Sequence, residues 1–171
     1  MIYFIVEGQT DKELIKNILA PKIEKTDFEF LGLKGIDSVK KTIVNLEELG
    51  LSQNLYFAIV DADTSFSNRN KEMEELTKTN KVPFYIFPNH KDNGDLETLL
   101  LSHVNKENEI IKCFNAYKTC VKKDIDNKAK LYAYTTLEHD KRPEQYIEEL
   151  DIGTEFDHLK EKLQNLFEGI Q

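Results

Sequence analysis

The pattern of apolar and polar residues along the chain predicts an α/β fold. Short apolar runs predict strands at residues 2–6, 28–33, 55–60 and 83–87. Between these runs, apolar residues recur at spacings of three and four, which predicts helices from residue 10, over residues 36–49 and over residues 68–79. Strands that alternate with helices favour a mainly parallel sheet covered by helices on both faces.

The second half of the chain is predicted to be largely helical. After a polar loop at residues 88–94, helical patterns occupy a short segment around 96–100, residues 107–121 and residues 156–167. A late apolar run at residues 129–134 predicts a further strand, so the sheet is expected to hold four to five strands. We expect one domain over residues 1–171, with a core of about 1–103 and a helical extension of about 104–171.

Composition narrows the class of protein. The chain has 171 residues, of which 40% are apolar, and no apolar stretch long enough to cross a membrane. Met1 leads directly into a β-like run without the basic leader of a signal peptide, so we expect a cytoplasmic protein. The net charge of −8 argues against non-specific binding of nucleic acid, although several lysine clusters leave specific contacts open.

Two of the predicted strands end in acidic residues. Glu7 and Gly8 follow the first strand, and Asp61-Ala62-Asp63 follows the third. Ligands of parallel sheets bind at the carboxyl ends of the strands, so these carboxylates are expected at one edge. Oxygen ligands suit Mg²⁺ or Mn²⁺, which predicts a divalent-metal site. Asp63 can join Asp61 there only if the strand stops at Asp61, because successive strand residues point to opposite faces.

Two further acids are expected near the same edge. Asp11 falls in the first turn after Gly8, within a Thr10-x-x-Glu13 pattern typical of a capping box, and Glu97 falls in the first turn after the polar loop. Both are equally suited to a helix N-terminus without any metal. Asp61 and Asp63 are in the same way suited to a turn. Clustered carboxylates repel one another, and a bound cation would relieve that repulsion.

The combined motifs resemble those of the Toprim domain, the metal-dependent module of topoisomerases, primases and OLD-type nucleases. The similarity is carried by Val6-Glu7-Gly8-Gln9-Thr10-Asp11, by Gly35 and by Val60-Asp61-Ala62-Asp63. Segments farther along resemble a group of small stand-alone Toprim-related bacterial proteins of unknown function, DUF3226: Gly94-Asp95-Leu96-Glu97 and Lys128-Ala129-Lys130-Leu131. The resemblance implies a Toprim-like, Rossmann-like sheet.

The resemblance also implies roles for individual residues. Glu7 would be a general acid/base or a metal ligand, and Asp61 and Asp63 would hold Mg²⁺. Asp11 and Glu97 would complete a second metal position, as in the OLD-type nucleases. Hydrolysis of phosphodiester bonds in DNA or RNA with one or two ions is the implied activity.

A basic residue is also needed to stabilise the pentacovalent phosphate. Lys128 is our first choice, since it precedes the late apolar run, and Lys91 in the polar loop is its competitor. A lysine at the start of a strand is also typical of a solvated edge charge.

Two other functions compete with the nuclease. Strand-Asp-x-Asp also opens the nucleophile motif of haloacid-dehalogenase phosphatases, in which the first Asp forms an aspartyl-phosphate. That motif requires the first strand, whereas here it follows the third. The chain also has no P-loop sequence, so a partner-dependent module that works with a separate ATPase or nucleic-acid-binding subunit is the non-enzymatic alternative.

Overall fold

The core of the protein is a four-stranded parallel sheet. The computed structural model describes residues 1–20, 27–32, 34–46, 54–78 and 81–168. The strands are β1 (Ile2–Val6), β2 (Phe28–Gly32), β3 (Leu55–Asp61) and β4 (Phe84–Phe87), in the order β2-β1-β3-β4. Because β1 lies between β2 and β3, the chain reverses its direction of winding there. That switch point is where open parallel sheets bind ligands.

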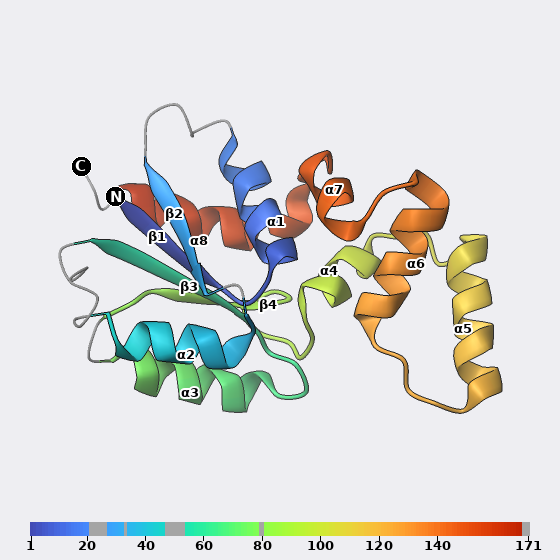
Figure 1. Ribbon diagram of the computed structural model, residues 1–171, viewed down its shortest axis with the longest axis horizontal. Helices are drawn as coiled ribbons and strands as arrows, with labels where there is room; N and C mark the ends of the chain where they lie inside the picture. The colour runs from blue at the N-terminus through green and yellow to red at the C-terminus, as the bar shows by residue number, and fades with distance from the viewer. Residues whose placement is uncertain (21–26, 33, 47–53, 79–80, 169–171) are drawn as a thin grey trace.

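Alternate strand residues face two separate helical layers. Phe4 and Phe57 pack on one side of the sheet, together with residues of α1 (Gln9–Leu19) and α8 (Asp157–Glu168). Ile5 and Ala58 pack on the other side, with residues of α2 (Ile36–Val44) and α3 (Phe66–Thr77). Figure 1 shows these two layers above and below the strands. The near-continuous apolar strands follow from this burial on both faces.

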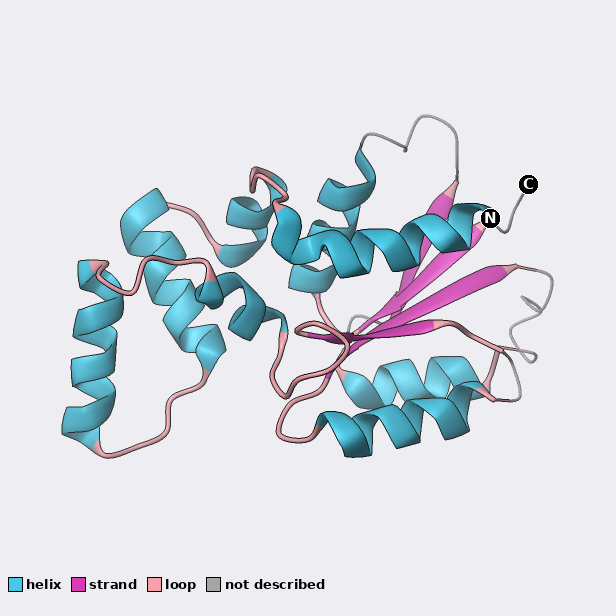
Figure 2. Ribbon diagram, turned by 180° about the vertical axis from the view of Figure 1, so that it is seen from behind, coloured by secondary structure: helices cyan, strands magenta, loops and turns pink. Residues whose placement is uncertain are grey.

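The C-terminal part is helical. It consists of α4 (Leu96–Ser102), α5 (Glu109–Val121), α6 (Asn127–His139), α7 (Pro143–Glu148), a 3₁₀ turn at Thr154–Phe156, and α8. Figure 2 shows α4 to α7 beyond one end of the sheet, with α5 farthest from it. α8 then returns to the sheet, where Leu159 and Leu163 are buried in the core.

Two predictions of secondary structure need correction. The run 129–134 is not a fifth strand but lies within α6, which begins at Asn127 and has Asp126 as its N-cap. A short apolar run does not distinguish a strand from a helix by itself. The short helix α7 was not predicted. The predicted helix over 36–49 is too long, because α2 ends at Val44 with Asn45 as its C-cap. Leu33 and Leu49, the predicted ends of the second strand and helix, lie outside the described residues.

Most other boundaries agree within two residues. The predicted strand at 83–87 begins at Phe84, and the charged helix expected at 68–79 runs from Phe66 to Thr77. Ser65 caps α3 by accepting a hydrogen bond from Asn68 N–H. Within the described part of the chain, no helix has the length and apolar character needed to cross a bilayer.

Asn17 joins the first helix to the C-terminal part. Its Nδ2 donates to the carbonyls of Ile147 and Leu150, at 2.7 and 2.8 Å, where α7 ends. We expect Asn17→Ala to lower the free energy of unfolding by about 1–3 kcal/mol, because both carbonyls lose the side-chain donor, and the Ile147 carbonyl keeps only backbone donors. Chemical denaturation measures this change. Asn70→Ala removes only an exposed bond to Glu74 and is the control, and equal losses would contradict the role of Asn17.

Candidate functional site

Four carboxylates and one lysine surround a single pocket at the carboxyl edge of the sheet. The pocket has a volume of about 190 Å³ and is lined by Glu7, Gly8, Thr10, Asp11, Gly35, Asp61, Glu97 and Lys128. It lies where β1 and β3 end, at the switch point of the sheet. Five of the six predicted site residues therefore meet here, and Asp63 does not line this pocket.

Glu7 and Asp61 are joined through the backbone. The N–H of Asp61 donates to Glu7 Oε1 at 2.8 Å, and the Leu96 N–H at the start of α4 donates to Asp61 Oδ1 at 3.1 Å. The end of β1 is also linked to the start of α2, because the Gly35 N–H donates to the carbonyl of Glu7 at 2.8 Å. Gly35 has a φ of +80°, a conformation that favours glycine and lets α2 start beside the end of β1.

Asp11 caps the first helix and also lines the pocket. Helix α1 begins at Gln9 with Gly8 as its N-cap, and Asp11 Oδ2 accepts the Gly8 N–H at 2.8 Å. The capping box predicted from Thr10 and Glu13 is therefore wrong by two residues. Asp11 is only 6% exposed and still lines the pocket, so capping uses one carboxylate oxygen and leaves the other.

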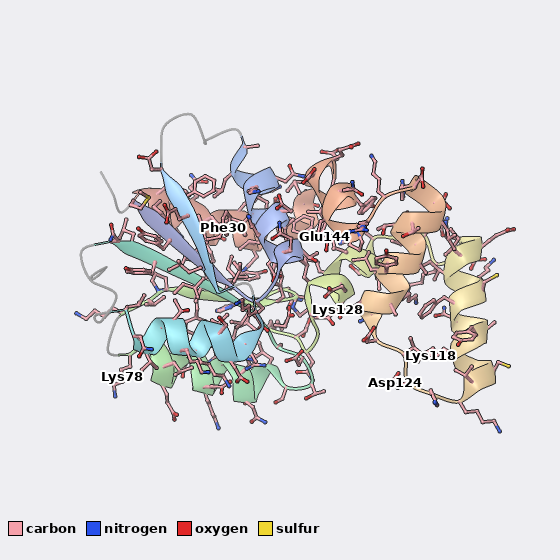
Figure 3. The ribbon with its side chains drawn as sticks, in the orientation of Figure 1. Phe30, Lys78, Lys118, Asp124, Lys128 and Glu144 are labelled. Carbon is pink, nitrogen blue, oxygen red and sulfur yellow. The ribbon has the colours of Figure 1, made fainter. Side chains whose placement is uncertain are left out.

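Glu97 and Lys128 come from the helical part. Glu97 lies in the first turn of α4, only 6% exposed. Lys128 lies in the first turn of α6, not at a strand edge, and Figure 3 shows it at the end of α6 nearest the sheet. That end is attached to α4, since Asn127 Nδ2 donates to Thr98 Oγ1 at 3.0 Å. The competitor Lys91 is exposed and does not line the pocket.

Burial and mutual repulsion make these carboxylates unusually basic. Burial is the main cause that raises the pKa of Asp61 to about 9, and the charges of Asp11, Glu7 and Glu97 add to it. Burial also raises the pKa of Asp11 to about 7. The pKa values of Glu7 and Glu97 are raised for the same first reason. Such perturbed groups in one pocket are typical of functional sites.

Lys128 responds in the opposite way to the same neighbours. Burial alone would lower its pKa, but the charges of Glu97, Asp61 and Asp11 outweigh burial and raise it. Lys128 therefore stays positively charged beside the acids. Within the described part of the chain it forms no ion pair shorter than 4 Å, so its charge is available to a ligand.

The donor set suits a hard cation that keeps some of its water. Among the described residues, no three acidic, histidine or cysteine side chains already have the spacing of a completed metal centre. Glu7, Asp11 and Asp61 instead each accept a backbone N–H through one oxygen, which leaves their second oxygen available. Mg²⁺ needs only one or two carboxylates and several waters. The residues present therefore fit such an ion, with carboxylates in excess.

Asp63 lies outside this group. Its side chain is 57% exposed and pairs with Arg69 Nη2 at 2.8 Å. Arg69 was missed from the sequence, although it is one of only two arginines and follows Asp61 by eight residues. Its positive charge lowers the pKa of Glu7 and so opposes part of the effect of burial. His90, in the polar loop at residues 88–94, stacks on Tyr85 and accepts the Ile86 N–H through Nδ1.

Comparison with known proteins gave one match. The family model DUF3226, described as a protein of unknown function, matches residues 2–168. Neither the curated proteins nor the solved structures contain a significant match. The match covers the sheet, the carboxylate pocket and the helical part together.

Proposed function

Because the chain belongs to the DUF3226 family, whose function is unknown, we propose a function from the site itself: Mg²⁺- or Mn²⁺-dependent hydrolysis of phosphodiester bonds in nucleic acid. One observation carries the proposal, the pocket that gathers Glu7, Asp11, Asp61 and Glu97 around Lys128 at the switch point. Carboxylates beside a lysine that keeps its positive charge suit metal-assisted phosphoryl chemistry. Apart from Asp63, the residues of the proposed site are those that the resemblance to Toprim domains implies.

Glu7, Asp11, Asp61 and Glu97 are the residues that would hold the cation. All four residues line the pocket, and Asp61 and Asp11 are almost fully buried. A bound divalent ion supplies Lewis-acid polarisation of a phosphoryl oxygen. It also offsets the burial and repulsion that raise the pKa values of these carboxylates, so binding releases protons from those that are protonated.

The protein's own groups supply the rest of the chemistry. Lys128 places a positive charge at the pocket, where it balances the negative charge that develops on the phosphate. Glu7 has an alternative role: where Asp11, Asp61 and Glu97 hold the ion, its Oε2 is the oxygen that would accept a proton from the attacking water, because Oε1 is held by the Asp61 N–H. Burial raises the pKa of Glu7 above that of an ordinary glutamate, which makes its carboxylate a stronger base.

A partner-dependent role is the second candidate. α5 and α6 leave three large side chains exposed: Tyr117 at 58%, Tyr132 at 50% and Leu137 at 71%. These helices extend away from the sheet in Figures 1 and 2. Together with the net charge of −8, this favours a separate ATPase or nucleic-acid-binding subunit that delivers the substrate. Under this view the isolated chain binds metal but does not cleave.

Thermal unfolding with chelator and with millimolar Mg²⁺ or Mn²⁺ tests the metal site. We expect the ion to raise the midpoint of the wild type, since an ion at a hundred times its Kd adds about 2.7 kcal/mol of stability. The variant Glu7→Gln/Asp61→Asn should lose this rise. No response of the wild type would contradict the proposal. A response without cleavage of DNA or RNA would favour the partner-dependent role.

A further inference from the structure

The side chain of Arg69, on helix α3, connects the end of β3 to helices α2 and α3. Its side chain, only 12% exposed, uses all three of its nitrogens. Nε donates to the carbonyl of Asp61 at 2.8 Å, Nη2 to Asp63 Oδ2 at 2.8 Å, and Nη1 to Glu72 Oε2 at 2.7 Å. Glu72 in turn pairs with Lys40 of α2 at 2.5 Å. The guanidinium is therefore tied at every nitrogen and holds a fixed orientation.

The backbone of Asp63 is fixed independently of its side chain. Its N–H and C=O both pair with Gly94, each at 2.8 Å, and its φ of +52° lies in the left-handed region. The carboxylate faces Arg69 in an open hollow of about 370 Å³, apart from the acidic pocket. Moving it to that pocket would break a charge-assisted pair, and the Gly94 bridge opposes a compensating shift of the backbone.

We propose that Arg69 is the positioning residue of the carboxylate pocket, and that Asp63 acts through Arg69 rather than as a metal ligand. The inference rests on the proposed function, because it concerns the placement of Asp61 toward a cation. Arg69 Nε holds the Asp61 carbonyl, while the Asp61 N–H donates to Glu7 Oε1 and its Oδ1 accepts from Leu96. Asp61 is thus held from three directions, and Arg69 supplies one of them.

The geometry of arginine matters here, beyond its charge. A lysine has one nitrogen and cannot reach a carbonyl and two carboxylates at fixed angles. Asp63 in turn keeps Nη2 occupied, so that Nε stays aimed at the Asp61 carbonyl. The second acid of the Asp61-Ala62-Asp63 motif therefore orients the guanidinium, and the first acid faces the ion.

Calorimetric titration with Mn²⁺ separates the two acids of the motif. We expect Asp61→Asn to weaken binding at least about a hundredfold, and Asp63→Asn to stay within about tenfold of the wild type, as for a residue outside the ligand set. If Asp63→Asn weakens binding as much as Asp61→Asn, Asp63 is a ligand and the inference is wrong. If the wild type does not bind Mn²⁺, the proposed function fails, and the inference fails with it.

Substitution of Arg69 tests positioning directly. With bis(p-nitrophenyl) phosphate and saturating Mn²⁺, we expect Arg69→Met to lower kcat about 10- to 100-fold with little change in KM. Arg69→Lys keeps the charge without the fork and should restore kcat only in part. Lys71→Met, an exposed lysine on the same helix, is the matched control and should equal the wild type.

Hydrogen exchange gives a readout that does not need turnover. We expect Arg69→Met to speed exchange of the Asp61 amide, which donates to Glu7, while Lys71→Met leaves it unchanged. Asp63→Asn should speed it less, because asparagine retains one acceptor oxygen. If both Arg69→Met and Asp63→Asn match the control in exchange and in kcat, Arg69 does not position the site and the inference is overturned, even where the wild type binds Mn²⁺.

Discussion

Replacing Asp61 by asparagine is expected to abolish metal-dependent cleavage while making the metal-free protein more heat-stable. Asparagine keeps an oxygen that can accept the Leu96 N–H, so the local fold is retained. It removes one of four carboxylates that share the pocket, which relieves repulsion and the cost of burying a charge. Each 1 kcal/mol gained would raise the unfolding midpoint by about 2–4 °C. Cleavage should fall at least about a hundredfold, because the neutral amide is a poor ligand for Mg²⁺.

The exposed acid Asp151 provides a charge-matched control. Asp151→Asn makes the same replacement at an exposed position that does not line the carboxylate pocket, so cleavage and midpoint should stay at wild-type values. Calorimetry in chelator measures the midpoint, and cleavage is followed with added Mg²⁺ or Mn²⁺. Full activity in Asp61→Asn would remove Asp61 from the metal site. A lower midpoint in chelator would show that the carboxylate stabilises the fold, contrary to the argument from repulsion.

The metal-free protein is also expected to lose stability as pH rises from about 6.5 to about 9. The folded-state pKa of Asp61 is raised to about 9, and that of Asp11 to about 7, from 3.8 for an ordinary aspartate. Over this window the folded protein still holds a proton on Asp61 that the unfolded chain has lost. Stability therefore falls with pH, by about 1.4 kcal/mol per pH unit for each proton held.

His90 gives the opposite slope at lower pH. Burial is the main cause that lowers its pKa to about 4, so between about pH 4 and pH 6.5 the unfolded chain binds a proton that the folded protein does not. Stability from this group rises with pH over that range. It offsets part of the loss from the two acids in that range, so the effect of the acids is measured above pH 6.5, where His90 no longer contributes.

Urea denaturation in chelator at pH 6.5, 7.5 and 8.5 measures this dependence. Asp61→Asn should show a shallower slope, because its amide does not titrate. Saturating Mg²⁺ should also flatten the slope of the wild type, since the ion binds the ionised carboxylates and its affinity rises with pH. Stability that stays constant or rises over this window in the wild type would show that the four acids are ionised without cost.

Much of the architecture could be predicted from the sequence for a simple physical reason. Strands buried on both faces read as unbroken apolar runs, and the acids that interrupt them at Glu7 and Asp61 mark the carboxyl edge. Because parallel strands end together, those two residues had to lie close in space. Asp11 and Glu97 were expected near the same edge because each falls in the first turn of a predicted helix.

Other features depend on contacts that no local pattern encodes. The run 129–134 suits a strand or a helix, and its packing decides for α6, whose first turn brings Lys128 to the acids. The two acids of Asp61-Ala62-Asp63 look alike in the sequence. Only the tertiary structure separates them, because Gly94 holds the Asp63 backbone and Arg69 holds its carboxylate outside the pocket. The sequence by itself thus determined the sheet and the acids at its edge, through burial and strand direction. The choice among those acids came from side chains distant in sequence.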